Sequence, residues 1–257
     1  MLKRRLSPEP IAAVADRSRG SAGFAALLAV IAVMLGRSGS VDPRAAIAVL
    51  ASALLFALAA IVLALWSVVV IWRTGRRGTA RASAGFVLAL ATLAYPAYLA
   101  ALAARLPDIA DVSTDPAAPP PFSNTPLARG ARGGFIHADP PPETLEAQRR
   151  AYPGLAPVVL DLGGDEAYDL VLKTVKARNW RIVEAVPPKG KFGSGHVDAV
   201  ATTRVMGLPD DLAIRIRPLS GQTRVDIRSA SRFGRSDFGA NAARIQSLSD
   251  DLQDADS

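Results

Sequence analysis

The sequence predicts an α+β protein in which three N-terminal transmembrane helices precede a two-layer domain with an antiparallel five-stranded sheet. Three long stretches without a charged residue, residues 20–36, 45–72 and 82–104, occupy the first part of the chain. From residue 153 onward, short β-type and helical runs follow one another in the order β-α-β-β-β-β-α. Adjacent strands with helices at the ends of the run indicate an antiparallel sheet with two helices on one face.

The three uncharged stretches contain 17, 28 and 23 residues. About 20 apolar helical residues cross the hydrocarbon core of a bilayer. The first stretch resembles the apolar part of a signal peptide, but the residues after it (34–38) lack the small-x-small cleavage pattern, so we expect an uncleaved helix. The sequence therefore predicts a membrane domain over residues 1–106, with the lipid bilayer as its surroundings.

The basic residues predict the orientation of these helices. The loop over residues 73–81 carries four arginines, whereas the first loop carries only Arg37 and Arg44. Short loops rich in Arg and Lys stay in the cytoplasm. The leader carries five more basic residues: Lys3, Arg4, Arg5, Arg17 and Arg19. With three spans, the N-terminus is cytoplasmic and the C-terminal domain lies outside, which predicts a multi-pass protein of the bacterial inner membrane with a periplasmic domain.

The interior of the three stretches contains no ionisable residue. Ion pathways and proton relays in membranes depend on such residues. We therefore expect the helices to anchor the protein and not to form a channel or a transporter.

Charge and composition exclude several function classes. The chain has a net charge of +7, but residues 1–105 carry +9 and residues 106–257 carry −2. The basic excess thus belongs to the membrane part, and we expect no nucleic-acid partner. The chain has no cysteine, which fits a bacterial envelope protein, and His137 and His196 match no metal-ligand spacing. The sequence predicts no metal and no cofactor.

A proline-rich connector is expected over residues 107–152. Proline-rich chains are extended and semi-stiff, so the connector forms either a spacer or a strap over the domain surface. Apolar residues within it indicate that part of it docks on the domain: Phe122, Leu127, Phe135 and Ile136. A short helix is expected over residues 142–151.

A soluble α+β domain is expected over residues 153–257. The predicted strands cover residues 158–162, 180–186, 196–205, 210–218 and 223–230, and the predicted helices cover 165–179 and 236 or 237 to 252. Alternation along the strands predicts an apolar face that meets the helices. The opposite face is then a lattice of polar residues, with cross-strand pairs of opposite charge: Asp198, Thr202, Arg204, Arg215, Arg217, Arg224, Asp226 and Arg228.

Two long blocks, residues 198–218 and 224–241, resemble an uncharacterised bacterial and plant family, domain of unknown function 1499. The first block reads DAVATTRVMG followed by DDLAIRIRP, and the second reads RVDIRSASRFGRSDFGAN. The resemblance covers about residues 152–252, and residues 111–116 (DVSTDP) are similar to membrane-anchored members. The family brings no established activity that the resemblance could imply for this chain.

The densest polar segment lies where the last strand passes into the last helix. Its arginines offer fork-like donors, and the helix start offers free N–H groups, so an anion or ligand site is one hypothesis. The alternative is structural, with an N-cap at Ser236 and an Arg–Asp network that joins strand to helix. The candidate residues are Arg204, Arg228, Arg232, Arg235, Ser236, Asp237 and Asn241.

The glycine-rich segment over residues 190–196 lacks a complete phosphate-binding pattern and is not followed by a helix, so a hairpin turn is predicted there. No motif identifies a catalytic residue. The leading hypothesis is a non-catalytic envelope module that binds a protein partner or an amphiphilic, lipid-like ligand, for which Ala199 and Ala201 would leave room under the helices. A hydrolase or another enzyme that uses the cluster at residues 226–241, and a structural subunit of a membrane complex, are the alternatives.

Overall fold

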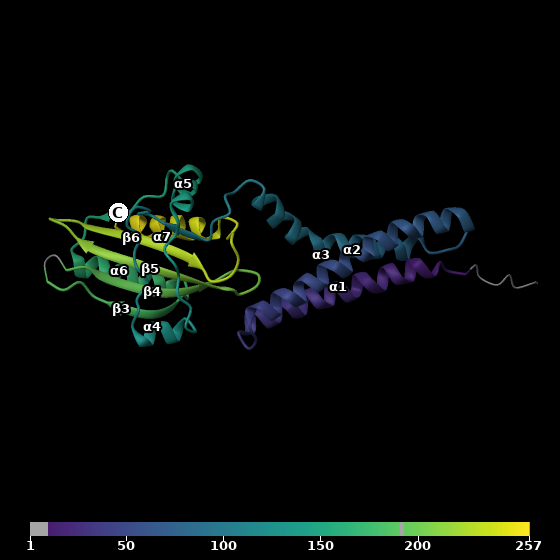
Figure 1. Cartoon of the computed structure of the whole chain (residues 1–257), viewed down its shortest axis with the longest axis horizontal. Coiled ribbons are helices and arrows are strands. Elements are labelled where there is room, and N and C mark those ends of the chain that lie inside the picture. The colour runs from purple at the N-terminus through teal and green to yellow at the C-terminus, as the bar shows by residue number, and fades with distance from the viewer. Residues whose placement is uncertain (1–9, 191–192, 257) are drawn as a thin grey trace, which may run out of the picture. The chain divides into compact units, whose positions relative to one another are not determined.

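The computed structural model describes residues 10–190 and 193–256. Lys3, Arg4 and Arg5 of the basic leader lie outside these ranges, as do Lys191 and Phe192 of the glycine-rich turn. The chain divides into two compact units (Figure 1). One comprises the residues up to 100 together with residues 205–207, and the other comprises residues 101–204 and those from 208 onward.

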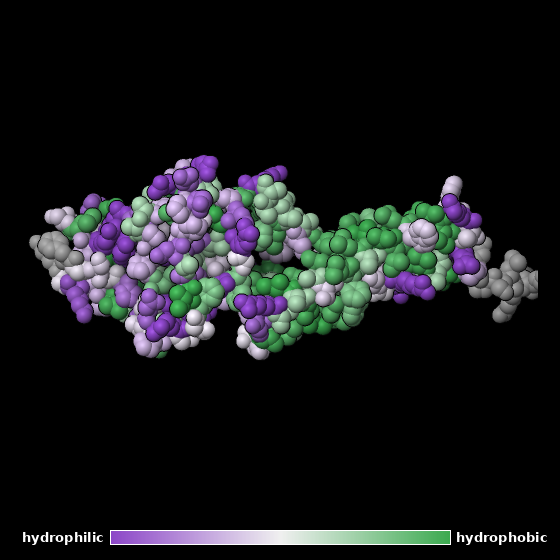
Figure 2. All heavy atoms as spheres, in the orientation of Figure 1, coloured by the Kyte–Doolittle hydropathy of each residue, from purple (hydrophilic) through white to green (hydrophobic). Residues whose placement is uncertain are grey.

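Three helices make up the first unit: α1 (Ala13–Ser38), α2 (Pro43–Thr74) and α3 (Thr79–Ala103). Helices α1 and α2 extend beyond their uncharged stretches at both ends, and α3 does so at its N-terminal end. All three are long and apolar enough to cross a membrane, which confirms the prediction of three apolar N-terminal helices. Large apolar side chains remain exposed along them, and Figure 2 shows the resulting apolar surface.

Small residues let the three helices approach closely, as is common in membrane bundles. Ala22 of α1, Ala57 of α2 and Ala89 of α3 belong to one buried cluster. The Ser18 hydroxyl of α1 donates a hydrogen bond to the Ala60 carbonyl oxygen of α2 at 2.9 Å. This packing is typical of an anchoring bundle.

The second unit contains one antiparallel sheet and four helices. The strands are β1 (Asp111–Ser113), β2 (Val158–Leu160), β3 (Arg181–Val186), β4 (Gly195–Thr202), β5 (Pro209–Pro218) and β6 (Thr223–Ser231). The helices are α4 (Pro126–Ala131), α5 (Pro142–Ala151), α6 (Gly164–Ala177) and α7 (Ala240–Asp256). The strand order is β1-β6-β5-β4-β3, and β2 also pairs with β6.

This arrangement confirms the predicted α+β class, the antiparallel sheet and the element order from residue 158 onward. The sheet has a sixth strand, β1, which the sequence did not predict because it is three residues long and lies in the proline-rich connector. The predicted helix over residues 142–151 is α5, whereas α4 was not predicted.

The apolar face of the sheet meets α6 and α7, as the alternation predicted. Val197, Ile214 and Ile227 lie side by side on β4, β5 and β6 and have no exposed surface. They share one core cluster with Val171 of α6 and Ile245 of α7. Ala199 and Ala201, expected to leave room under the helices, belong to the same cluster.

Several element boundaries differ from the predicted ones, and two of the larger differences have local causes. Strand β4 ends at Thr202 and not at residue 205, because Thr203 and Leu208 close a turn. The Thr203 N–H donates to the Leu208 carbonyl oxygen at 2.8 Å, and the Leu208 N–H donates to the Thr203 hydroxyl at 2.9 Å. Helix α7 begins at Ala240 and not at residue 236 or 237, because Phe238 (φ 54°) and Gly239 (φ 81°) are left-handed.

The core packing predicts a large effect of truncating Ile245. Ile245→Ala should lower the free energy of unfolding of this unit by about 3 kcal/mol, because it leaves a cavity in a fully buried cluster. Leu219→Ala is the control: this side chain is 48 % exposed, and its loss should cost less than about 0.5 kcal/mol. Urea unfolding of the full chain in detergent micelles measures the free energies of unfolding of both variants. Trp66 and Trp72 are replaced by Phe, so that the fluorescence reports on Trp180 alone. Equal losses of unfolding free energy in Ile245→Ala and Leu219→Ala would contradict the described burial of Ile245 in the core.

Candidate ligand site

The polar face of the sheet is covered by a strap, defined as residues 114–139. Figure 1 shows this segment crossing one face of the sheet while α6 and α7 cover the other. The connector is therefore a strap over the domain and not a spacer, which settles the two alternatives that its composition left open. Its contacts with the sheet are mostly charged.

The first of these contacts is an ion cluster around Asp226 of β6, which has no exposed surface. Asp226 accepts hydrogen bonds from the Nε atoms of Arg215 (3.0 Å) and Arg224 (2.8 Å). Its Oδ2 atom also lies 2.9 Å from Nη2 of Arg217. Asp115 of the strap lies 2.8 Å from Arg224 Nη2 and within 3.7 Å of the other two arginines. Three guanidinium groups thus share two carboxylates, one of which belongs to the strap.

The second contact is a buried pair between Asp198 of β4 and Arg132 of the strap. The two side chains are 2 % and 3 % exposed, and Arg132 Nη1 lies 3.1 Å from Asp198 Oδ2. The Ser123 N–H also donates to Asp198 Oδ2, at 2.7 Å. Burial raises the pKa of Asp198 above its ordinary value, although both hydrogen bonds act to lower it.

The third contact joins His137 of the strap to Asp211 of β5. His137 Nε2 lies 2.7 Å from Asp211 Oδ2, and Arg232 donates to both carboxylate oxygens of Asp211 at 2.6 and 2.9 Å. Burial acts to raise the pKa of Asp211, but the hydrogen bonds from His137 and Arg232 hold it below its ordinary value. The His137 ring also stacks on Phe122, another residue of the strap, at 4.4 Å between centroids.

The predicted candidate arginines are distributed over several places. Arg228 is buried and lies 2.6 Å from Asp111 of β1, and Arg232 pairs with Asp211. Arg235 is exposed, with its Nε 3.1 Å from a carboxylate oxygen of Asp108. Arg204 lies in the turn after β4 and not on a strand. The structure therefore does not bring the four predicted arginines together into one site.

The remaining candidates, Ser236, Asp237 and Asn241, organise the start of α7. The cap is Asp237 and not Ser236: its carboxylate accepts hydrogen bonds from the N–H groups of Gly239 (3.0 Å) and Asn241 (2.6 Å). Ser236 accepts one from the Phe238 N–H at 3.3 Å. Burial raises the pKa of Asp237 above its ordinary value.

Asn241 is fully buried and joins α7 to the sheet. Its Oδ1 accepts from the Ser229 hydroxyl at 2.7 Å, and its Nδ2 donates to the Ser231 hydroxyl and to the Ala110 carbonyl oxygen, both at 3.0 Å. All three guanidinium nitrogens of Arg228 and the side-chain amide of Asn241 thus bond within the domain, and Arg232 donates from Nε and Nη2 to Asp211. This favours the structural interpretation of the cluster.

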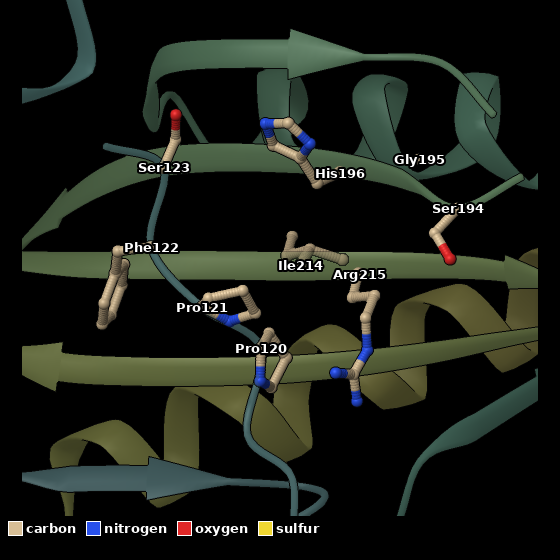
Figure 3. Close-up of a pocket in the computed structure, with 9 residues that line it drawn as sticks. All are labelled: Pro120, Pro121, Phe122, Ser123, Ser194, Gly195, His196, Ile214 and Arg215. Carbon is tan, nitrogen blue, oxygen red and sulfur yellow. The ribbon is translucent and has the colours of Figure 1, made fainter. Parts of the chain in front are cut away.

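A cavity of about 220 Å³ lies between the strap and the sheet. Residues 120–123 of the strap, 194–196 at the start of β4 and 214–215 of β5 line it (Figure 3). Its polar groups are two serine side chains, the imidazole of His196 and the guanidinium of Arg215. The cavity is lined by no carboxylate among the residues that the structure describes.

Arg215 and His196 are direct cross-strand neighbours in this cavity. Arg215 uses Nε for Asp226 and donates from Nη2 to the Ala118 carbonyl oxygen at 2.9 Å, whereas its Nη1 has no hydrogen-bond partner in the described part of the chain. His196 Nε2 lies 3.4 Å from Glu184 Oε2. The pKa of Glu184 lies below its ordinary value because the Ser123 hydroxyl and then His196 bond to its carboxylate.

Sequence analysis did not identify the strap partners Asp111, Asp115, Arg132 and His137. Two signals pointed towards them: the similarity of residues 111–116 to membrane-anchored family members, and the apolar residues that predicted docking of the connector. Strands β3 and β4 pair as an antiparallel hairpin, and β4 begins at Gly195, so Gly195 and His196 of the predicted turn belong to this strand.

Comparison with known protein families gives one result. A family described as "Protein of unknown function (DUF1499)" matches residues 111–252, more than half of the chain. The match begins at β1 and therefore includes the strap. The two blocks that first suggested the family, residues 198–218 and 224–241, lie further along the chain. No curated protein matches the chain.

The opposite pKa shifts of Asp211 and Asp198 predict opposite effects of acid. The pKa of Asp211 in the folded state lies below its ordinary value of 3.8, so its carboxylate stabilises the fold above about pH 4, and this stabilisation is lost as the pH falls. The stability advantage of the wild type over Asp211→Asn should therefore shrink between pH 6 and pH 3.

Asp198→Asn is the matched control, since the folded-state pKa of Asp198 lies above its ordinary value. The folded state binds the proton more tightly there, so the wild type should gain stability relative to this variant as the pH falls. Urea unfolding at several pH values measures both differences. If the stability difference from the wild type changed with pH in the same direction for both variants, the opposite pKa shifts of Asp211 and Asp198 would be contradicted.

Proposed function

The chain belongs to the DUF1499 family, and we propose that it is a non-catalytic, membrane-anchored module of the bacterial envelope that binds a ligand in the cavity under the strap. The cavity carries the proposal, because it joins an apolar wall to a few fixed polar groups, as small-molecule sites do. The three helices that are long and apolar enough to span a membrane support the anchoring role.

The size of the cavity favours a compact ligand group. Sites for drug-sized ligands have volumes of about 300–1,000 Å³, and this cavity is smaller. A head group, a chain end or a single side chain of a partner fits this volume better than a complete lipid. The space beneath α6 and α7, where a lipid-like ligand was first expected, is occupied by the continuous core cluster.

The chemistry of the cavity supports binding over catalysis. An activated serine needs a general base within hydrogen-bond reach. Within the described residues, neither Ser123 nor Ser194 hydrogen-bonds to His196, whose partner is Glu184. The Ser123 hydroxyl bonds to Glu184, but the pKa of this carboxyl group lies below its ordinary value, which makes it a weak base. The Arg/Asp cluster at residues 226–241 contributes its side chains to the ion pairs and caps described above, so its charges stabilise the domain.

The proposed orientation can be tested by labelling, because the native chain has no cysteine. Ser220→Cys places a single thiol in the exposed turn after β5, and Arg76→Cys places one in the exposed loop between α2 and α3. A membrane-impermeant maleimide should label Ser220→Cys in intact spheroplasts and Arg76→Cys only after lysis. The reverse pattern would overturn the proposed orientation.

Binding can be tested by native mass spectrometry of the full chain extracted from membranes. The wild type should retain a bound ligand, and Ser194→Trp should lose it, because the indole would fill the mouth of the cavity. Ser194 is exposed, so the larger side chain should leave the fold intact.

Ser220→Trp is the matched control, since it places the same side chain at an exposed position outside the cavity. It should retain the ligand as the wild type does. A wild-type protein that carries no ligand or partner, or a ligand that persists in Ser194→Trp, would refute the proposed function.

A further inference from the structure

We propose that the cavity under the strap selects an anionic, hydrogen-bond-accepting group, a carboxylate or a phosphate, which Arg215 and Ser194 hold against the rings of Pro120 and Pro121. This inference rests on the proposed function and names the ligand chemistry of the same site. It concerns the cavity of Figure 3 and not the arginine cluster that the sequence indicated.

The unused hydrogen-bonding groups of the cavity are the first argument. The Arg215 guanidinium has five N–H donors, and Nη1 carries two that meet no acceptor within the described residues. The Ser194 hydroxyl likewise has no hydrogen-bond partner there, and His196 adds an imidazole beside Arg215. The lining contains no carboxylate, so within the described residues the cavity offers the open donors of Arg215 and Ser194 no acidic partner, whereas the His196 ring points away from Arg215 in Figure 3.

The local charge balance is the second argument. Arg215, Arg217 and Arg224 share only two carboxylates, Asp115 and Asp226, so the cluster keeps an excess of one positive charge. Asp226 is fully buried, and the Asp115 side chain is 17 % exposed, so neither carboxylate turns fully to solvent. A guanidinium held in a fixed position by such partners is preorganised for a bidentate contact with a carboxylate or a phosphate.

The shape of the lining is the third argument. In Figure 3, the rings of Pro120 and Pro121 stand over the sheet beside Arg215, and Phe122 points away from Arg215. The Phe122 ring is held between His137 and the Arg228 guanidinium, 4.8 Å from its centroid, so the segment that carries both prolines is fixed. These proline rings offer a flat apolar surface for the part of the ligand next to its anionic group.

A pair of ligands that differ in charge tests this inference. Ligand-observed ¹⁹F NMR on the full chain in detergent micelles measures the affinities of 4-fluorobenzoate and 4-fluorobenzamide, which share their shape and ring. The wild type should bind the benzoate at least tenfold more tightly, and added salt should reduce this preference. Phenyl phosphate and benzoate as competitors then tell whether phosphate or carboxylate is preferred.

Variants separate a loss of charge from a loss of structure. Arg215→Gln should abolish the preference for benzoate while benzamide binding changes less than twofold; Arg215→Lys should retain part of the preference. Arg217→Gln is the matched control, because Arg217 pairs with the same Asp226 but does not line the cavity. It removes the same unit of positive charge but leaves the donor in the cavity, so it should keep clearly more of the preference than Arg215→Gln does.

The outcomes distinguish this inference from the proposed function. Equal affinities for both probes, or a loss of preference in Arg217→Gln as large as in Arg215→Gln, would overturn anion selection. If the wild type still retains a ligand from membranes and Ser194→Trp loses it, the proposed binding function stands, and only the proposed selectivity for an anion is wrong. If the benzoate preference is found but no ligand is retained from membranes, the selectivity stands and the proposed function fails.

Discussion

The burial of one carboxylate, that of Asp226, governs the polar side of the sheet. A buried charge is costly unless it is paired and hydrogen-bonded, and Asp226 has no exposed surface and three arginine partners. Three guanidinium groups around one carboxylate leave a large positive excess. Asp115 of the strap reduces that excess and shields Asp226 from water at the same time. The strap is thus part of the domain, because its carboxylate belongs to the same ion cluster as the buried Asp226.

The same ion lattice positions the donor of the proposed ligand site. Arg215 pairs with Asp226 through Nε, holds the strap carbonyl of Ala118 through Nη2, and leaves Nη1 for the cavity. One side chain therefore closes the strap and offers the donor. Buried ion pairs often contribute little net stability compared with an apolar core. Their value here lies in fixing the position of Arg215 and of the proline rings, because a preorganised site loses less entropy on binding.

Local patterns in the sequence were sufficient to predict the elements but not their long-range partners. Alternation of apolar and polar residues predicted both faces of the sheet, since Val197, Ile214 and Ile227 follow the strand period. Proline content predicted an extended connector but not its position on the sheet. The position depends on pairs far apart in the sequence, such as Asp115 with Arg224, and no local period encodes such pairs.

The start of α7 also could not be predicted from the local sequence alone. Ser236 and Asp237 are both good capping residues, and their order in the chain does not decide between them. The left-handed conformation of Phe238 decides, because it moves the first helical turn to Ala240. The candidate arginines were identified by residue type alone. Their partners, Asp111 for Arg228 and Asp211 for Arg232, lie on other strands, so the difference between a ligand site and a structural ion pair appears only in three dimensions.

The total charge of the domain is a poor guide to its ligand for a related reason. Residues 106–257 carry a net charge of −2, which by itself would disfavour an anionic ligand. Many of these charges, however, are paired within the fold, including the buried ones of Asp198, Asp211 and Asp226. At ordinary ionic strength, exposed charges more than about 8–10 Å away are largely screened. For the proposed ligand, the open donors of the cavity therefore matter more than the net charge, and they are cationic or neutral although the domain as a whole is acidic.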